Sequence, residues 1–235
     1  MPLVKAAAII PAAGQGKRMG NQLNKQFLSL GGLPLLLHTC TALAQVLELK
    51  QMIVVARPGE EEEIARVLSP LIRKERERWL IVSGGEERQH SVWNGLQQVR
   101  PDLALVAVHD GARPLITPDI VRSALQMAQE TGAAVVGVPV KDTIKTVDEQ
   151  GLIIGTPERK RLWAVQTPQV FRRDWLLAAY QQAWQEGFLG TDDAALVERA
   201  GYPVRMLQGD YANLKITTPE DMILAEALLQ ARGGM

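Results

Sequence analysis

The chain has 235 residues, of which 46% are hydrophobic and 22% are charged, a composition typical of a globular protein with a large buried core. Basic and acidic residues number 26 each, so the formal net charge is zero and argues against a general attraction to nucleic acid or to an anionic membrane. Cys40 is the only cysteine, which excludes an intrachain disulfide. The sequence shows neither a signal-peptide pattern nor an apolar run of ~18 residues, and it therefore predicts a cytoplasmic protein.

Short apolar runs alternate along the chain with longer stretches of helical periodicity. The predicted strands are AAAII (6–10), QMIVVA (51–56), WLIVS (79–83), LALVAVH (103–109) and AAVVGVPV (133–140). The predicted helices between them cover residues 34–47, 60–68, 88–99 and 117–131. This alternation is typical of a parallel sheet with helices on both faces. The sequence therefore predicts an α/β fold with a Rossmann-like, mostly parallel sheet.

Residues 141–165 interrupt this alternation with a polar segment that has a turn at Glu149-Gln150-Gly151. The segment is too polar for a central strand and predicts a hairpin-like arm that projects from the domain. Helical periodicity resumes over 172–187 and again from Thr191, and a last helix is expected at TPED (218–221), where Thr218 caps the first turn. We therefore expect a single domain over 1–235 with the arm as its one excursion.

The stretch IIPAAGQGKRMG (9–20) places a loop of small residues directly after the first strand. Met19 stands where both the dinucleotide fingerprint and the P-loop pattern need a glycine. Small residues let backbone N–H groups approach a phosphate, and Lys17, Arg18 and Lys25 add three cations. The loop indicates a polyphosphate site, although a tight turn before a solvated basic helix start fits the same pattern.

A dinucleotide-dependent dehydrogenase would also need an acidic residue at the end of its second strand. Ala56, Arg57 and Pro58 occupy that corner instead. The sequence thus lacks both the third glycine of the fingerprint and the acidic residue after the second strand, which argues against a dehydrogenase.

Two further strands end in residues suited to nucleotide binding. Gly84 and Gly85 follow the third strand, with Ser91 just inside the next helix, and Asp110 and Arg113 follow the fourth. A carboxylate at such a strand end suits Mg²⁺, which takes one or two carboxylates together with substrate phosphates. Taken alone, Asp110 is equally well read as a turn former or a helix cap.

Eight motifs occur in order across nearly the whole chain: PAAGQGKRMG, NKQF, GGEERQHSV, VHDGARP, KDTIK, LWAVQTPQVF, TDDAA and NLKITTPED. Together they resemble the 2-C-methyl-D-erythritol 4-phosphate cytidylyltransferases of the non-mevalonate isoprenoid pathway. The first motif is shared by many sugar nucleotidyltransferases, whereas HDGARP together with TPQ and KITTPED is more specific. Cytidylyltransferases for ribitol 5-phosphate or another polyol phosphate have the most similar pattern and are the alternative.

The resemblance implies roles for individual residues. Expected to bind the nucleotide, CTP, are Pro11, Ala12, Ala13, Gly14, Gly16, Lys17, Gly85, Glu86 and Ser91. Expected to be catalytic are Arg18, Lys25 and Lys215. Expected around the polyol phosphate are Arg113, Thr143, Arg161, Thr167 and Thr191, with Asp110 as the ligand of Mg²⁺. The chain departs from the family pattern at Gly111, where alanine is usual, and at Glu86, where aspartate is common.

The implied reaction needs no activated side chain, because a phosphate monoester dianion is already a nucleophile. Positioning and charge stabilisation remain as the tasks of the protein. The resemblance also implies a homodimer in which the arm reaches the partner's site, so that Arg161 acts in trans and Lys215 in cis. A non-catalytic nucleotide-sensing domain is a distant alternative, since such a domain should have lost Lys25, Asp110 or Lys215.

Overall fold

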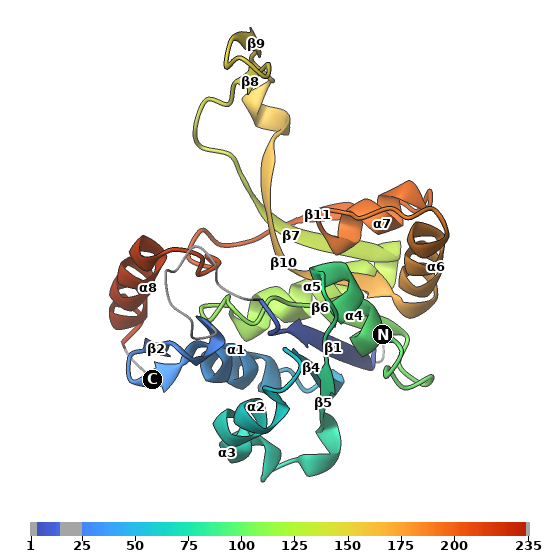
Figure 1. The fold of residues 1–235 in the computed structure, drawn as a ribbon, viewed down its shortest axis with the longest axis vertical. Helices are drawn as coiled ribbons and strands as arrows, with labels where there is room; N and C mark the ends of the chain where they lie inside the picture. The colour runs from blue at the N-terminus through green and yellow to red at the C-terminus, as the bar shows by residue number, and fades with distance from the viewer. Residues whose placement is uncertain (1–3, 15–24, 234–235) are drawn as a thin grey trace.

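A computed structural model describes residues 4–14 and 25–233, and its core is a single sheet of seven strands in the order β11-β7-β10-β6-β1-β4-β5 (Figure 1). The strands are β1 (Ala6–Pro11), β4 (Leu49–Ala56), β5 (Trp79–Ser83), β6 (Leu105–Val108), β7 (Ala133–Pro139), β10 (Trp163–Arg172) and β11 (Arg205–Gln208). All neighbours pair in parallel except β10, which runs antiparallel to both β6 and β7. The predicted mostly parallel sheet is confirmed.

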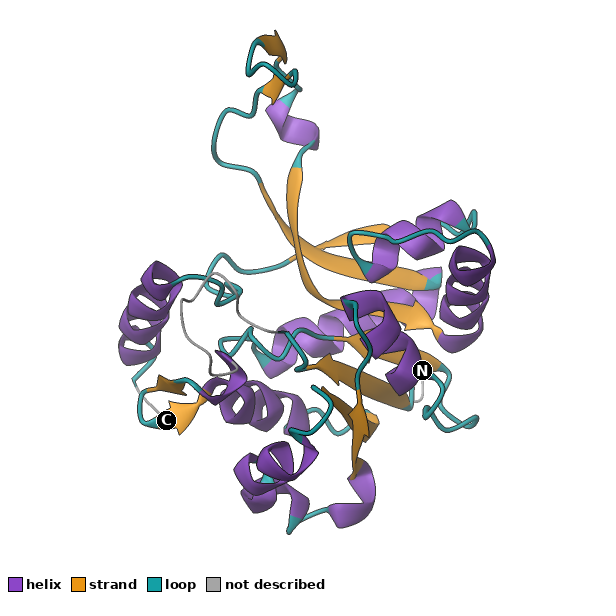
Figure 2. Cartoon of the chain, in the orientation of Figure 1, coloured by secondary structure: helices purple, strands orange, loops and turns teal. Residues whose placement is uncertain are grey.

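Helices cover both faces of this sheet (Figure 2). One face packs against α1 (Leu35–Ala44), α2 (Glu61–Val67) and α5 (Pro118–Thr131), and the other against α4 (Arg88–Leu96), α6 (Arg173–Gln185) and α7 (Asp193–Arg199). Alternate residues of β1 belong to the two cores: Ala8 and Ile10 to the first, Ala7 and Ile9 to the second, all fully buried. A strand covered on both faces must be apolar throughout, which is why these runs were recognisable in the sequence.

A smaller apolar cluster joins α8 (Pro219–Ala231) to the rest of the molecule. It includes Leu30 of the short strand pair β2 (Ser29–Leu30) and β3 (Leu33–Pro34). The predicted cap of α8 is confirmed, because Thr218 and Asp221 exchange hydrogen bonds as a capping box. The remaining elements are α3 (Ser69–Ile72) and the 3-10 helices η2 (Lys25–Phe27), η3 (Arg76–Arg78) and η4 (Arg159–Arg161). No helix among the described residues is long and apolar enough to cross a bilayer.

The central strand β10 was not predicted, and its proline explains why. Pro168 cannot donate a ladder hydrogen bond and argues against a central strand. The pairing of β10 with β7 shifts register between Val165 and Gln169, so that Pro168 lies within this irregularity. Because Trp163 already pairs with Pro139, the last three residues of the predicted arm belong to the sheet. The edge strand β11 was also missed.

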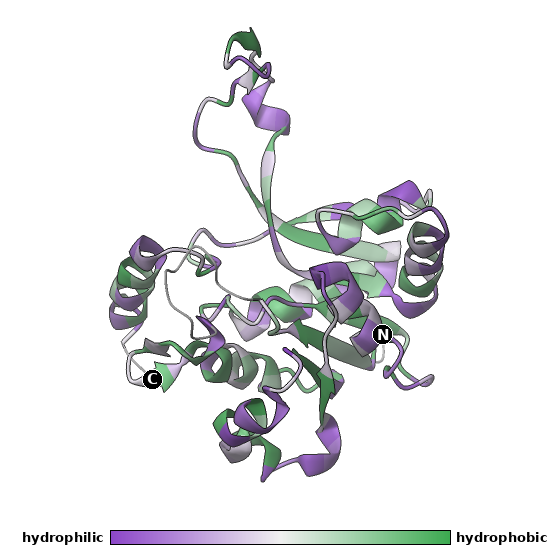
Figure 3. Ribbon diagram, in the orientation of Figure 1, coloured by the Kyte–Doolittle hydropathy of each residue, from purple (hydrophilic) through white to green (hydrophobic). Residues whose placement is uncertain are grey.

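The arm leaves the sheet after β7 and returns through β10, projecting well beyond the helical layers (Figures 1 and 2). Its far end is the strand pair β8 (Thr146–Val147) and β9 (Ile153–Gly155), joined by a turn in which Gly151 has a φ of 83°. Apolar side chains there are exposed, namely Ile144, Val147, Leu152, Ile153 and Ile154. Figure 3 shows this hydrophobic end as green ribbon at β9.

Candidate active site

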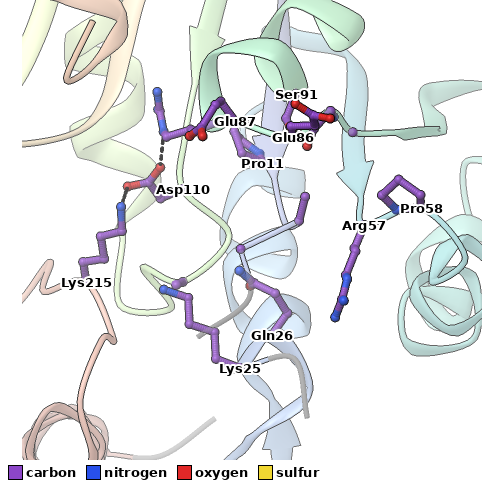
Figure 4. Close-up of a pocket in the computed structure, with 16 residues that line it drawn as sticks. Pro11, Lys25, Gln26, Arg57, Pro58, Glu86, Glu87, Ser91, Asp110 and Lys215 are labelled. Carbon is purple, nitrogen blue, oxygen red and sulfur yellow. Dashed lines mark hydrogen bonds and ion pairs between the residues drawn. The ribbon is translucent and has the colours of Figure 1, made fainter. Parts of the chain in front are cut away.

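A cavity of about 600 Å³ lies at the carboxyl ends of four neighbouring parallel strands, β1, β4, β5 and β6 (Figure 4). Its lining residues from the segments after these strands are Pro11, Ala13, Gly14, Arg57, Pro58, Gly84, Gly85, Glu86, Glu87, Arg88, Asp110 and Ala112. Lys25, Gln26, Ser91 and Lys215 complete the lining. Ligands of open α/β sheets bind at this edge. We call this feature the strand-end cavity.

Only some of the described residues of the first loop offer a backbone donor to the cavity. The amide of Ala12 donates to the carbonyl of Val55 at 2.8 Å and so extends the pairing of β1 with β4. Pro11 has no N–H, so among the described residues of this loop the amides of Ala13 and Gly14 are the ones at the cavity wall. The predicted residues Gly16, Lys17 and Arg18 lie outside the described residues.

Close packing explains both glycines of the loop after β5. A Cβ on Gly84 would lie 2.7 Å from Ser91 Oγ and 2.9 Å from the carbonyl of Ala56, and one on Gly85 would lie 2.5 Å from the Cβ of His90. Ser91 Oγ accepts from the amide of Gly85 at 3.1 Å and donates to its carbonyl at 3.4 Å. Ser91 therefore holds this loop in shape while also lining the cavity.

Lys25 is nearly buried, with 9% of its surface exposed, and lines the strand-end cavity. Its Nζ donates to the backbone carbonyl of Ile216 at 3.1 Å, 191 residues along the chain. This bond ties the ammonium group to the segment that also carries Lys215. The two lysines that were predicted to be catalytic thus lie on connected parts of the wall.

Asp110, just after β6, is surrounded by three cations (Figure 4 shows two of the contacts as dashed lines). Its Oδ1 lies 3.3 Å from Arg88 Nε, and its Oδ2 lies 2.9 Å from Lys215 Nζ and 3.7 Å from Arg113 Nε. Burial by itself would raise the pKa of this carboxyl, but Arg88, Lys215 and Arg113 together hold it well below its usual range. Asp110 is therefore ionised at neutral pH.

The backbone of Asp110 is held by a second, neutral set of contacts. Its amide donates to Thr167 Oγ1 at 3.0 Å, and the same oxygen lies 3.1 Å from Nδ1 of the fully buried His109. The Nε2 of the same ring faces the backbone carbonyl of Arg113 at 3.5 Å, which can only accept, so the neutral ring carries its proton on Nε2 and its Nδ1 accepts from the Thr167 hydroxyl. Burial, aided by Arg113, outweighs the opposing effect of Asp110 and lowers the pKa of His109 to about 4, so this imidazole is neutral.

The segment 209–216 connects Lys215 with the base of the arm. The side-chain Nδ2 of Asn213 donates to the backbone carbonyl of Thr167 at 2.9 Å, and the backbone carbonyl of Asn213 accepts from Arg113 Nη1 at 2.7 Å. The hydroxyl of Tyr211 donates to the carbonyl of Pro139, the last residue of β7, at 2.7 Å. Lys141 Nζ lies 3.5 Å from the centroid of the Tyr211 ring. Contacts therefore run from the start of the arm to the surroundings of Asp110.

Comparison with known proteins identifies the family. A model of the family 2-C-methyl-D-erythritol 4-phosphate cytidylyltransferase matches residues 6–231. The chain belongs to this family. The enzyme of that name from Caldanaerobacter subterraneus subsp. tengcongensis is 48% identical over 228 residues, which cover 97% of this chain and all of the relative. The one from Pelotomaculum thermopropionicum is also 48% identical, over 98% of this chain and 96% of the relative.

Solved structures agree with this assignment. The 4-diphosphocytidyl-2C-methyl-D-erythritol synthase of Anaerococcus prevotii is similar with a TM-score of 0.86 and 31% identity, over 97% of this chain and 96% of that one. The cytidylyltransferase of Thermus thermophilus is similar with a TM-score of 0.79 and 34% identity, over 97% of this chain and 100% of that one. This chain is accordingly an enzyme of the nucleotidyltransferase class.

The structure divides the residues expected to bind the polyol phosphate into two groups. Arg113 and Thr167 contact Asp110 directly. Thr143 and Arg161 lie on the arm, where the Arg161 side chain is 81% exposed and pairs with Glu158 at 3.0 Å. Thr191 is exposed in the loop before α7, and like the two arm residues it is not among the described residues that line the strand-end cavity.

Several lining residues were not predicted as site residues, namely Gln26, Arg57, Pro58, Glu87, Arg88 and Ala112. Their positions could have suggested them. Arg57 directly follows the buried strand β4, and Asp110 lies two residues after β6; residues at such ends face the ligand edge of the sheet. Arg88 is the first residue of α4, which follows Gly84 and Gly85. Only its ion pairs with Asp110 and Asp193 distinguish it from an ordinary surface arginine.

Proposed function

We propose that this family member transfers the cytidylyl group of CTP to 2-C-methyl-D-erythritol 4-phosphate at the strand-end cavity. A phosphate oxygen of the acceptor forms a bond to the α-phosphorus of CTP, and the bond from that phosphorus to the β-phosphate oxygen breaks. The products are 4-diphosphocytidyl-2-C-methyl-D-erythritol and pyrophosphate. The observation that carries the proposal is the convergence of Lys25, Arg88 and Lys215 on one cavity beside the buried carboxylate of Asp110, which also pairs with Arg113.

The cations act by binding and by charge stabilisation. Lys25, with Arg18 from outside the described residues, holds the phosphates of CTP and stabilises the charge that builds up on the departing pyrophosphate. Lys215 orients the attacking phosphate. Ala13, Gly14, Gly85, Glu86 and Ser91 form the nucleoside side of the cavity. The small side chains of Ala13, Gly85 and Ser91 on this side of the cavity leave room for the pyrimidine base of CTP.

Asp110 fits a magnesium ion that arrives together with the nucleotide. Its carboxylate is ionised, and Mg²⁺ in such sites takes one or two carboxylates, with phosphate oxygens and water as the other ligands. Three cations within 4 Å of this carboxylate disfavour a bare divalent ion. When bound, the ion would neutralise charge on the triphosphate. No group of three or more His, Cys, Asp or Glu side chains suited to a metal occurs among the described residues.

The arm supports a homodimer. Its exposed apolar end (Ile144, Val147, Leu152, Ile153 and Ile154) needs a covering surface, which a second copy would supply. Thr143 and Arg161 would then reach the acceptor site of the partner subunit, because both lie on the arm rather than at the cavity of their own chain. The reaction belongs in the cytoplasm, where the buried thiol of Cys40 stays reduced.

A panel of acceptors tests the proposal. Purified protein is incubated with CTP, Mg²⁺ and one of 2-C-methyl-D-erythritol 4-phosphate, ribitol 5-phosphate or erythritol 4-phosphate, and pyrophosphate release and product mass are measured. Turnover is expected with the methylerythritol phosphate. Preference for ribitol 5-phosphate would favour the alternative cytidylyltransferase, and CTP binding without turnover on any acceptor would favour a nucleotide sensor.

A further inference from the structure

Arg88 is the first residue of α4 and bridges two acidic side chains from distant segments. Its Nε lies 3.3 Å from Asp110 Oδ1, and its Nη2 lies 2.8 Å from Asp193 Oδ2. The planar guanidinium group presents several donors in a fixed fork, so one side chain can hold both carboxylates at defined angles. Neither the sequence motifs nor the proposed reaction assigns a role to this bridge.

The far end of the bridge is anchored in the second core. The side chain of Asp193 is 1% exposed, and its Oδ1 accepts from the hydroxyl of Tyr180, itself 1% exposed, at 2.5 Å. The preceding residue, Asp192, caps α7 by accepting from the amide of Ala195 at 2.9 Å. The buried Gln169 of β10 accepts from the amide of Ala194 and donates to Asp192. Asp193 is therefore held on both sides by contacts that do not involve the strand-end cavity.

The near end of the bridge fixes one oxygen of Asp110. Lys215 and Arg113 approach Oδ2, whereas Arg88 approaches Oδ1. Lys215 comes from an irregular segment and its side chain is 38% exposed, so it is a weaker constraint than an arginine anchored to a buried carboxylate. Without Arg88, the Asp110 carboxylate could turn toward Lys215 and Arg113 and withdraw Oδ1 from its present orientation.

We infer that Arg88 is a positioning residue for Asp110, with Asp193 as its anchor, and that this bridge sets the orientation in which Asp110 serves the transfer reaction. The inference rests on the proposed function. It gives separate roles to the two adjacent aspartates of TDDAA. Asp192 caps α7, and Asp193 holds Arg88, which in turn orients Asp110. Asp193 is not among the described residues that line the cavity, so any effect of it on turnover must pass through another group.

The test compares Arg88→Gln, Arg88→Lys and Asp193→Asn by steady-state kinetics with CTP and the methylerythritol phosphate. Outer groups that orient a functional carboxylate typically contribute ~10–100-fold, so Arg88→Gln and Asp193→Asn should each lower kcat by about that factor, with the KM for CTP changing less than ~3-fold. Arg88→Lys should recover part of the loss, because lysine supplies charge without the fork. Arg172→Gln is the matched control, since Arg172 pairs with Asp174 on the surface and should leave kcat unchanged.

A double-mutant cycle decides whether Arg88 acts through Asp110. In an Asp110→Asn background, Arg88→Gln should lower kcat by less than ~3-fold further, because the group that it orients is already gone. An undiminished loss in that background, a raised KM for CTP with normal kcat, or a wild-type kcat for Asp193→Asn would each overturn the inference. If Arg88→Gln does not fold, Arg88→Lys and Asp193→Asn carry the same comparison.

Stability measurements separate this inference from the proposed function. The losses in Tm caused by Arg88→Gln and Asp193→Asn should be less than additive in the double variant, whatever reaction the protein catalyses. A wild-type protein without turnover on any acceptor would defeat the proposed function while leaving this coupling in place. Additive losses in Tm would mean that the bridge does not form in solution.

Discussion

Replacing Asp110 by asparagine tests whether this one carboxylate balances the cations around it. The side chains of Asp110 and Arg113 are each 9% exposed, so they form the buried part of the cluster, whereas Arg88 is 30% and Lys215 is 38% exposed. Removing one partner of a buried pair typically costs about 3–5 kcal/mol, and exposed pairs contribute less than about 1 kcal/mol. Arg88 also keeps Asp193 as a partner.

We therefore expect Asp110→Asn to lower the free energy of unfolding by about 2–3 kcal/mol in the absence of ligand. For a chain of this length each kcal/mol corresponds to a Tm change of about 2–4 °C, which gives a loss of roughly 4–12 °C. The assay is thermal unfolding followed by circular dichroism, without nucleotide or metal.

The same substitution should strengthen the binding of metal-free pyrophosphate. The variant has one negative charge fewer in the strand-end cavity while its lysines and arginines remain, so added pyrophosphate should raise its Tm by more than it raises that of the wild type. Turnover should nevertheless fall by about 10²-fold or more, as when a preorganised electrostatic group is lost. Lower stability, tighter anion binding and slower turnover are expected together.

Asp174→Asn is the matched control, because Asp174 forms an exposed ion pair with Arg172 and its loss should lower Tm by no more than about 2 °C. The reasoning is refuted if Asp110→Asn unfolds within that same margin of the wild type. It is also refuted if pyrophosphate stabilises the variant less than the wild type.

Three further predictions follow from the lining of the cavity and from the arm. Lys25→Ala should lower kcat by ~10²–10³-fold with a smaller change in the KM for CTP, because its charge acts mainly on the transition state, and a change in KM alone would make it a ground-state contact. CTP should be strongly preferred over ATP and GTP in a competition assay, since the small lining residues Ala13, Gly85 and Ser91 suit a pyrimidine base, and equal turnover with ATP would contradict this. Arg161→Ala and Lys215→Ala should each be inactive alone but regain about a quarter of wild-type activity when refolded together, because half of the dimers are mixed and each has one intact site. No recovery would place both residues at the same subunit's site.

The fold was largely predictable because burial on both faces leaves a clear pattern. β1, β6 and β7 are apolar throughout, β4 and β5 are apolar over most of their length, and each predicted run overlaps the observed strand. β10 was missed because Pro168 makes a central strand look like a loop, and only pairing with both neighbours, with a register shift at the proline, makes it possible. Such pairing is a property of the assembled sheet and cannot be read from one segment.

The site was predictable in part, for a related physical reason. Residues shortly after strands, such as Gly85 and Asp110, were identified because the carboxyl ends of parallel strands share one edge. Arg88 was not identified, since an arginine at a helix start usually faces solvent. Its role depends on Asp193, 105 residues later, and on the packing of Tyr180 behind it.

The contacts also explain how the cavity can hold so much positive charge in one place. Lys25 donates to the backbone carbonyl of Ile216 and Arg113 to that of Asn213, so a carbonyl dipole orients each cation, and for Arg113 this adds to its ion pair with Asp110. Both carbonyls belong to the segment that carries Lys215, and the same segment contacts the base of the arm through Tyr211. A movement of the arm would therefore shift Lys25, Arg113 and Lys215 together, because all three are bonded to or part of the segment 209–216. In a dimer held by the arm, assembly and the spacing of the charges that bind phosphate would be physically linked.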